Sequence, residues 1–464
     1  MPLTNNSVTR HIDASGNEIK AFLDNTDNSY VQAMAIVDED GDQLTSQHTI
    51  GNGNALDVNV RSLNGQASDS FGRLRVSELY PLLETTSRYD IDESIWHVPT
   101  PVGAATVTHS ATNASIQLST GDGTNGNEAQ LVTLKNFRYQ PGKSQLVMQT
   151  LSIVNPTEAD CDKRWGYFDD DNGLFWGVVN GQFGVGVRDN GVDTFVPQPS
   201  FNRDKLDGTG DLGLETDLTK SQIYYISFQY LGVGIVEFGV YCRDGRVIPA
   251  HVFQNANSQV YSYMQTAVLP LRYEVKNTGA ATSGACGINV LCATVNSDAG
   301  YEPLYTVINS VSNDDFVATT NANEIPILSI RAKDELPLGS GVANKVEVVP
   351  LSLSIACESK SAIIRIRENC ALTTPVWVDK GTQSAVEYDT SSTTQSGGKV
   401  VDTFVLNSDQ NQTINLENIF SANKQSLTFN NAGQNESITI TIERVGSGAT
   451  DTSVLSSITW AEIR

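Results

Sequence analysis

The chain has 464 residues, of which 30 are basic and 53 acidic, so its formal net charge is −23. This charge argues against nucleic acid or an anionic membrane surface as the main partner, because both would repel the chain. The length predicts two or three domains. The abundance of Ser, Thr, Asn, Val and Ile favours strands over helices.

The first residues have neither the basic nor the apolar region of a signal peptide, and no apolar run approaches the ~18 residues of a membrane helix. We therefore expect a protein that is made and kept in a cytosol until assembly. Its cysteines are widely spaced, and no two form a Cys-x-x-Cys pair. We expect them to be buried apolar side chains rather than disulfides. They are Cys161, Cys242, Cys286, Cys292, Cys357 and Cys370.

Residues 1–75 are predicted to be an extended arm for anchoring and assembly. Their apolar islands, such as 30–37 and 56–60, are short and are separated by Gly, Asn and Asp. Islands of this size cannot build a core, so we expect the arm to pack on the body, on a second copy or on another protein. Three alternating acids within residues 38–42 resemble half of a calcium loop. The later loop positions do not match, so we favour a turn and predict no metal.

The arm ends in residues 71–77, where apolar and basic residues alternate after Gly72. A period of two predicts a strand with one apolar face and one basic face. We expect this strand to be an assembly interface whose arginines pair with acidic groups of a neighbouring subunit. The alternative is an ordinary edge strand with solvated arginines. The interface residues are Phe71, Arg73, Leu74, Arg75 and Val76.

After a polar connector at 76–95, residues 96–300 are predicted to form the central β-sandwich. Asn180-Gly181 between two alternating apolar runs predicts a tight hairpin. The repeated short strands and turns predict two antiparallel sheets packed face to face, similar to a concanavalin or laminin-G type of jelly roll. The predicted strands cover residues 114–118, 145–151, 173–179, 182–187, 223–230 and 234–241.

Residues 301–324 are predicted to be a linker, and 325–464 a smaller C-terminal β-sandwich. Residues 437–443 alternate between Ile and Thr, which predicts a strand with Ile inside and Thr outside. Trp460 is expected on the final strand. The other predicted strands cover residues 325–331, 346–349, 351–356, 362–367 and 403–406. The fold class predicted for the whole chain is all-β.

Signals for catalysis are weak throughout the chain. The five histidines are isolated, and there is no nucleophile elbow, P-loop or dinucleotide fingerprint. We therefore predict a protein that is not an enzyme and needs no cofactor.

Aromatic and acidic residues gather in one region, which leaves glycan binding open as an alternative. Residues Trp165, Tyr167, Asp170 and Trp176 combine rings that stack on sugars with a carboxylate that binds hydroxyls, and an Asp-rich loop follows at 204–217. The favoured interpretation is that the acids form turns and that the rings lie in the sandwich core.

Several segments together resemble a family of tailed-bacteriophage virion structural proteins. The most specific is Asp69-Ser70-Phe71-Gly72-Arg73-Leu74-Arg75-Val76-Ser77, and Trp460-Ala461-Glu462-Ile463 looks like a familiar ending of the family. The other matching segments are 139–144, 165–169, 206–210, 230–234, 269–274 and 327–333.

The resemblance implies a non-enzymatic virion protein, made in the host cytoplasm. We expect an appendage of the tail, neck or baseplate, or a fibre, that docks through its N-terminal arm. The expected partners are other copies of the chain, in a closed oligomer such as a trimer, and other virion proteins. The alternatives are a capsid decoration protein and a host-glycan receptor or glycan-degrading protein.

Overall fold

A computed structural model describes residues 79–464 except 211–212, 244, 299, 301–306, 315–316, 320–322, 423–425 and 447–451, together with the backbone of five strands nearer the N-terminus. The chain divides into two units, Met1–Leu63 and Asn64–Arg464. The predicted interface residues Phe71, Arg73, Leu74, Arg75 and Val76 lie outside the described residues. The first unit contains β1 (Thr9–Ile12), β2 (Glu18–Asp24), β3 (Ser29–Gln32), β4 (Gln47–Ile50) and β5 (Gly53–Leu56).

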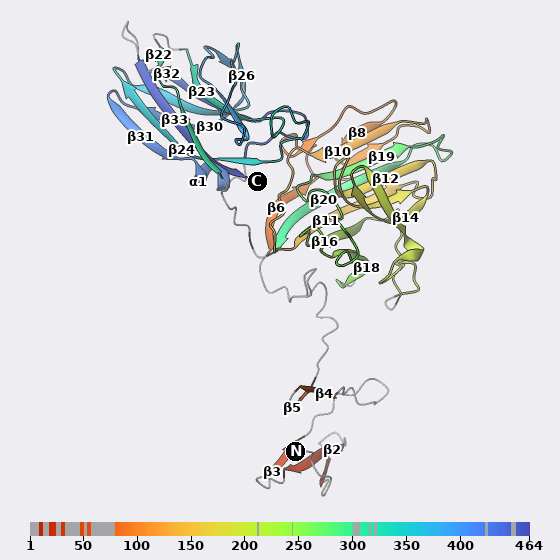
Figure 1. Cartoon of the computed structure of the whole chain (residues 1–464). Coiled ribbons are helices and arrows are strands. Elements are labelled where there is room, and N and C mark those ends of the chain that lie inside the picture. The colour runs from red at the N-terminus through yellow and green to blue at the C-terminus, as the bar shows by residue number, and fades with distance from the viewer. Residues whose placement is uncertain are drawn as a thin grey trace. The chain divides into compact units, whose positions relative to one another are not determined.

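The first layer of the central sandwich is a seven-stranded antiparallel sheet within the described residues, in the order β15-β14-β13-β12-β19-β10-β7. In Figure 1, β10, β19, β12 and β14 can be followed side by side in this layer. Its strands are β7 (Trp96–His97), β10 (Glu128–Thr133), β12 (Cys161–Phe168), β13 (Gly173–Val179), β14 (Gln182–Asp189), β15 (Val192–Pro197) and β19 (Leu271–Asn277).

The second layer has the order β18-β17-β16-β11-β20-β9-β8, and β6 also pairs with β20. Short 3₁₀ helix η1 (Gln198–Ser200) follows β15. The strands of this layer are β6 (Leu79–Thr86), β8 (Thr106–Ser110), β9 (Ser115–Ser119), β11 (Gln145–Val154), β16 (Gln222–Phe228), β17 (Val236–Tyr241), β18 (Val247–Phe253) and β20 (Gly287–Asp298).

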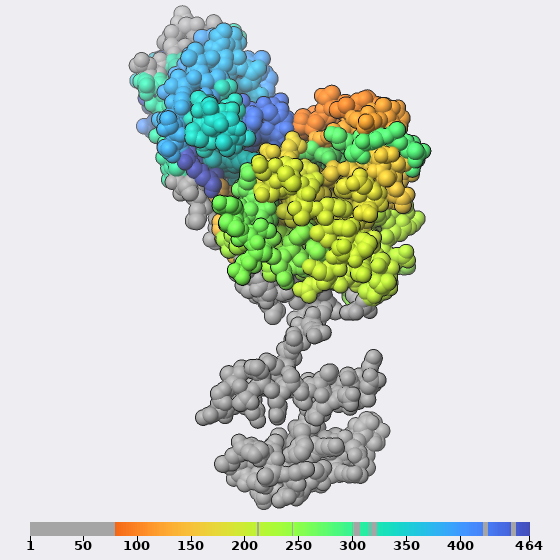
Figure 2. Space-filling model, turned by 45° about the vertical axis from the view of Figure 1, so that its right-hand side comes forward, coloured from red at the N-terminus to blue at the C-terminus, as the bar shows by residue number. Residues whose placement is uncertain are grey.

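Apolar side chains from both layers fill the space between the two sheets. Trp165 and Trp176 of the first layer contact Tyr224 of the second, with ring centroids 5.1 and 5.3 Å apart. The space-filling view shows these strands, coloured orange to green, as a closely packed body (Figure 2). The hairpin predicted at Asn180-Gly181 joins β13 to β14, and both of its residues have positive φ values, of 50° and 71°.

The C-terminal sandwich has a five-stranded and a six-stranded sheet in the described part of the chain. The first contains β21 (Val307–Ser312), β22 (Val317–Thr319), β24 (Glu347–Glu358), β31 (Gln410–Asn415) and β33 (Thr452–Ile463). The second contains β23 (Ile325–Ala332), β25 (Ala362–Glu368), β27 (Val378–Asp379), β28 (Val386–Asp389), β30 (Lys399–Leu406) and β32 (Ser437–Arg444). The pair β26 (Ala371–Leu372) and β29 (Gln395–Ser396) and helix α1 (Glu417–Ala422) complete the fold. The all-β fold class predicted from the sequence is confirmed.

Two segments predicted as connections are instead strands of the sandwiches. Residues 79–86 of the predicted connector form β6, which pairs with β20 in the central sandwich. Within the predicted linker, β21 and β22 both pair with the final strand β33. Sequence reasoning missed them because an edge strand with one solvated side carries little apolar signal.

The alternation predicted for β32 is present, but the threonines on its outer side are not exposed. The isoleucines Ile438, Ile440 and Ile442 lie in the core, but Thr439 and Thr441 are fully buried as well. Their hydroxyls have partners on the same face of the sheet: Thr439 Oγ1 lies 3.0 Å from Ser329 Oγ, directly opposite on β23. Thr441 donates to a carboxylate oxygen of Glu324. Polar side chains therefore cover this face of the sheet.

All six cysteines are free thiols, and Cys161, Cys286, Cys357 and Cys370 are buried as predicted. The exceptions are Cys242, which is half-buried, and Cys292, which is exposed because its position on β20 faces away from the core. No helix among the described residues is long and apolar enough to cross a membrane.

Candidate functional site

The rings proposed for glycan binding lie inside the central sandwich, so that assignment needs correction. Trp165, Tyr167 and Trp176 have no exposed surface. The Nε1 of Trp176 donates to Tyr225 O at 3.2 Å, and the hydroxyl of Tyr167 donates to Ala267 O at 2.9 Å. Successive strand residues point to opposite faces. The residues between these rings therefore form the outer face of the seven-stranded sheet.

This outer face carries aromatic, basic and acidic side chains at positions directly opposite one another. One row across the sheet reads Phe195, Gly186, Phe175, Gly166 and Arg272. A second row reads Gly184, Gly177, Arg164, Glu274 and Gln130. Glycines thus alternate with large side chains in the first row.

The glycines allow aromatic rings to lie flat on the sheet. A Cβ built on Gly186 would lie 2.3 Å from Cζ of Phe175, closer than two carbon atoms can approach. The ring of Phe175 stacks on Phe195, with centroids 6.5 Å apart and planes 13° apart. It also contacts Phe168, at 5.7 Å. Phe168 and Phe175 have no exposed surface.

Three guanidinium groups cover these rings. The Cζ of Arg164 lies 5.7 Å from the centroid of Phe175, and Arg188 lies 5.4 Å from that of Phe168. Arg272 lies 5.3 Å from the centroid of Phe168. At these distances a cation is attracted to the face of an aromatic ring. The three arginines retain only 7–12% of their side-chain exposure.

Carboxylates then pair with every one of these arginines. Arg188 binds Asp193 through two bonds, of 2.6 and 3.1 Å. Nη2 of Arg164 lies 3.0 Å from Oδ2 of Asp162, and Nη1 of Arg164 lies 3.3 Å from Oε1 of Glu274. Arg272 also binds Glu274, at 2.6 Å.

The electrostatic balance of this face favours the charged forms. Burial lowers the pKa of Arg188, whereas the hydrogen bond to Asp193 and the charges of nearby acids raise it. The second effect is larger, so the net pKa is above its usual value. Burial likewise raises the pKa of Glu128, but the hydrogen bond and charge of Lys276 outweigh it, so the net pKa is below its usual value. The face is therefore a fixed network of ions. A general acid or base needs a pKa near neutrality, which these shifts oppose.

Asp170 is the one predicted glycan residue that lies at the surface. Its side chain is 86% exposed, and its Oδ1 lies 2.6 Å from Nη1 of Arg272. The neighbouring carboxylate of Asp169 accepts bonds from the backbone N of Asp171 and Asn172, at 2.9 and 2.7 Å. The turn predicted for this acidic run is therefore present.

The acids of the loop at 204–217 also form turns where they are described. Asp207 Oδ1 accepts from the backbone N of Thr209 at 3.0 Å, and Asp217 Oδ1 accepts from that of Thr219 at 2.9 Å. Asp204 is buried and accepts from the backbone N of Leu206 at 2.8 Å. These carboxylates stabilise the loop and do not converge on a common point.

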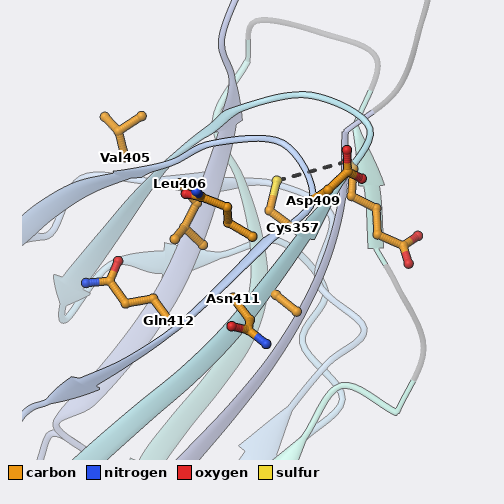
Figure 3. Close-up of a pocket in the computed structure, with 9 residues that line it drawn as sticks. Cys357, Val405, Leu406, Asp409, Asn411 and Gln412 are labelled. Carbon is orange, nitrogen blue, oxygen red and sulfur yellow. Dashed lines mark hydrogen bonds between the residues drawn. The ribbon is translucent and has the colours of Figure 1, made fainter.

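A groove of about 730 Å³ opens in the C-terminal sandwich beside β24, β30 and β31. Figure 3 shows Cys357, Asp409, Asn411 and Gln412 around it. The Cys357 thiol donates to Lys360 O at 2.9 Å, and burial raises its pKa. A protonated thiol is a poor nucleophile, so the raised pKa lowers the reactivity of Cys357.

Within the described residues, no three His, Cys, Asp or Glu side chains come together to hold a metal ion. His251 is packed against Phe201 and Phe253, and burial lowers its pKa. The acids at 38–42 lie outside the described part.

Sequence reasoning selected the right strands for this surface but the wrong face. It missed Arg164, Phe175, Arg188, Arg272 and Glu274. The sequence contains a signal for this face. The glycines at 166, 177, 184 and 186 occupy the same alternate strand positions as these residues and so lie on the same face of the sheet. A glycine directly opposite a large residue on the neighbouring strand indicates a ring that lies flat on the sheet. This signal can be used only when it is known which strands pair and in which register.

No protein-family model and no curated protein matches this chain. Among solved structures, the carbohydrate recognition domain of Emp47p is 12% identical, with 47% of this chain and 93% of that chain covered and a TM-score of 0.29. Arcelin-5, a lectin-like defense protein from Phaseolus vulgaris, is 9% identical, with 46% and 98% covered and a TM-score of 0.30.

The CBM2 module of the evolved Dit of Lactobacillus casei BL23 phage J-1 is 9% identical, with 49% and 99% covered and a TM-score of 0.30. Likenesses this weak support no inference about what this chain binds.

Proposed function

We propose that this chain is a non-enzymatic structural protein of a tailed-bacteriophage virion. Residues 1–75 dock it to the particle, and its two sandwiches project as part of a tail, neck or baseplate appendage. The resemblance of residues 69–77 and of the later segments to phage virion proteins motivates this proposal. The paired, buried ions on the outer face of the central sandwich are compatible with a rigid displayed surface.

One observation carries the proposal: the described segments that resemble the phage family build the cores. Tyr139, in one segment, contacts Tyr230, in another, with ring centroids 5.9 Å apart and nearly perpendicular planes. Trp165, Tyr273 and Trp460 belong to three further segments, and all are fully buried. The resemblance therefore concerns packing residues, which is what proteins that share a framework have in common.

Deletion of residues 1–75 tests the docking role. We expect the shortened protein to stay soluble with an unchanged melting temperature, but to be absent from purified particles by quantitative mass spectrometry. Incorporation at the normal copy number would contradict the proposal. Two full-length double variants show whether the positive charge of the arm matters for docking. Arg73→Glu with Arg75→Glu should impair incorporation, whereas Arg73→Lys with Arg75→Lys should retain it.

Images of intact particles labelled with an antibody to this chain locate it. Label at the tail, neck or baseplate in few copies is the expected result. Label spread over the head in many copies would instead identify a capsid decoration protein.

A second candidate function is glycan binding by the outer face of the seven-stranded sheet. The observation that favours it is the exposed carboxylate of Asp170, which the buried Arg272 holds at 2.6 Å. A carboxylate fixed beside a guanidinium presents an acceptor and donors to neighbouring sugar hydroxyls. Because Phe168 and Phe175 are covered, such a site would rely on hydrogen bonds rather than ring stacking.

Binding of host surface polysaccharide, measured by calorimetry, tests this candidate. Asp170→Asn should weaken binding about tenfold, which corresponds to about 1.4 kcal/mol, without altering the melting temperature. Asp171→Asn is the matched control, since its side chain is an exposed neighbour outside the ion pair. Equal binding by wild type and Asp170→Asn would exclude this site.

A further inference from the structure

Two edge strands border the groove of the C-terminal sandwich. Within the described residues, β31 is the last strand of the five-stranded sheet and β30 is the last strand of the six-stranded sheet. The free side of an edge strand presents backbone N–H and C=O groups that can pair with another strand. Sheets commonly protect such an edge with a charged side chain or a proline, and β31 contains neither. Its edge is therefore open to the addition of a strand.

The two faces of the sheet differ at this edge. On the core side, Ile414 of β31 packs against the apolar core, and Leu406 of β30 belongs to that core. On the outer side, Thr413 Oγ1 lies 3.1 Å from Ser354 Oγ of β24. Glu358 shares the outer face of β24 with Ser354 and is exposed. A strand that fits here carries apolar side chains on one face and polar or charged side chains on the other.

The groove is acidic at one end. Its lining residues include two acids, Glu358 and Asp409, and no basic residue. The two carboxylates lie close to each other, because Cys357 pairs with Gln410 across β24 and β31 and each acid is the next residue along its strand. Figure 3 shows Asp409 beside Cys357. Like charges on neighbouring strands repel each other, so a cationic partner would stabilise this end of the groove.

One segment of the chain has the matching pattern of side chains. In residues 71–77, which lie outside the described residues, Arg73 and Arg75 alternate with Leu74 and Val76. An extended conformation places the two arginines on one face and the two apolar side chains on the other. The segment is also similar in length to β31.

We propose that the groove beside β31 binds residues 71–77 of a second copy of the chain as an added strand. Backbone hydrogen bonds to the free edge of β31 supply affinity, and the alternating side chains supply specificity. The apolar side chains of the segment meet the core side of the groove. Its arginines pair with the carboxylates of Glu358 and Asp409.

The occupant comes from a second copy because the segment is tethered in its own chain. Only Glu78 separates it from β6, which pairs with β20 of the central sandwich. A link this short spans about 7 Å, and the groove belongs to the C-terminal sandwich. A contact from the arm of one copy to the body of the next is head-to-tail, and such contacts can close into a ring. The assignment rests on the proposed function, since it names the surface that the assembly arm binds.

Self-association of the purified full-length chain, measured by multi-angle light scattering, tests this contact. The groove variant is Glu358→Lys with Asp409→Asn; Asn is chosen because the φ of Asp409 is 59°, which Asn tolerates better than Lys. The arm variant is Arg73→Glu with Arg75→Glu. We expect a closed oligomer for the wild type and about tenfold weaker association for each variant.

A charge exchange and a control accompany this measurement. The chain that carries both sets of substitutions should associate more strongly than either variant alone, because the acidic arm then meets a basic groove. Asp90→Asn with Glu93→Lys changes the net charge as much as the groove variant does, at two exposed positions, and should associate like the wild type. A monomeric wild-type chain, or association that ignores the groove variant, overturns the proposal.

A fluorescent peptide of residues 69–77 probes the groove directly. It is titrated into the full-length arm variant, whose weakened arm leaves the groove free, and binding is followed by anisotropy. Binding should saturate and should weaken about tenfold when the groove substitutions are added. Failure to bind, or equal binding after those substitutions, overturns the inference. Peptide binding by a chain that is absent from particles would support the groove assignment and contradict only the virion role.

Discussion

The ring of Phe175 lies directly on Gly186 of the neighbouring strand, at a distance that no Cβ could share. This contact allows the layer of rings to sit flat on the seven-stranded sheet and support the arginines above it. The surface of the central sandwich therefore depends on a pair of residues that face each other across two strands.

Gly186→Ala should lower the free energy of unfolding by about 1–3 kcal/mol, because the new methyl group would overlap Phe175. Urea unfolding followed by fluorescence measures the change. Gly177→Ala is the control on the same face; its Cβ would approach no atom closer than 3.0 Å, so the cost should be smaller. Adding Phe175→Leu should recover part of the loss in Gly186→Ala, and a purely additive result would contradict the proposed overlap.

Trp176→Ala should destabilise the protein by about 3–5 kcal/mol, because Trp176 is fully buried and bonded to Tyr225 O. Asp170→Ala should cost less than about 1 kcal/mol, as expected for an exposed carboxylate. Thermal or chemical unfolding compares the two. Similar stability of both variants would show that the ring is not a core residue.

Glu158 predicts a dependence of stability on pH. Hydrogen bonds from Ser283 lower the pKa of Glu158 to about 2, from an ordinary value of 4.5. A pKa that is lower in the folded state contributes stability that is complete above pH 4.5 and is lost as the pH falls towards 2. Glu158→Gln should therefore lower the melting temperature at pH 7, and the difference from wild type should shrink between pH 4.5 and 2. A difference that stays constant over this range would contradict the assignment.

Glu462 predicts a structural role for the C-terminal strand. Its carboxylate is fully buried and accepts from Ser384 Oγ at 2.6 Å, Ala385 N at 3.0 Å and Asn309 Nδ2 at 3.1 Å. Glu462→Ala should cost about 3 kcal/mol or more, because it leaves these donors without their acceptor. Glu93→Ala, at an exposed position, should leave the unfolding midpoint unchanged. A neutral result for Glu462→Ala would show that water replaces the carboxylate.

The sequence by itself determined the all-β class, the Asn180-Gly181 hairpin and most strands of both sandwiches, because alternation and turn residues are local signals. It also indicated that the acids around Asp169 and Asp207 form turns, which their contacts to backbone N atoms two residues later confirm.

The tertiary structure alone decided which residues meet. Alternation along a strand divides its side chains between two faces of the sheet, but it does not say which face packs against the core. For this reason Trp165 and Trp176 were considered for a surface, whereas Arg164 and Arg272 form it. The contact between Trp165 and Tyr224 likewise joins two layers that are distant in the chain. Such contacts depend on how the sheets pack, and packing is not encoded in any short stretch of sequence.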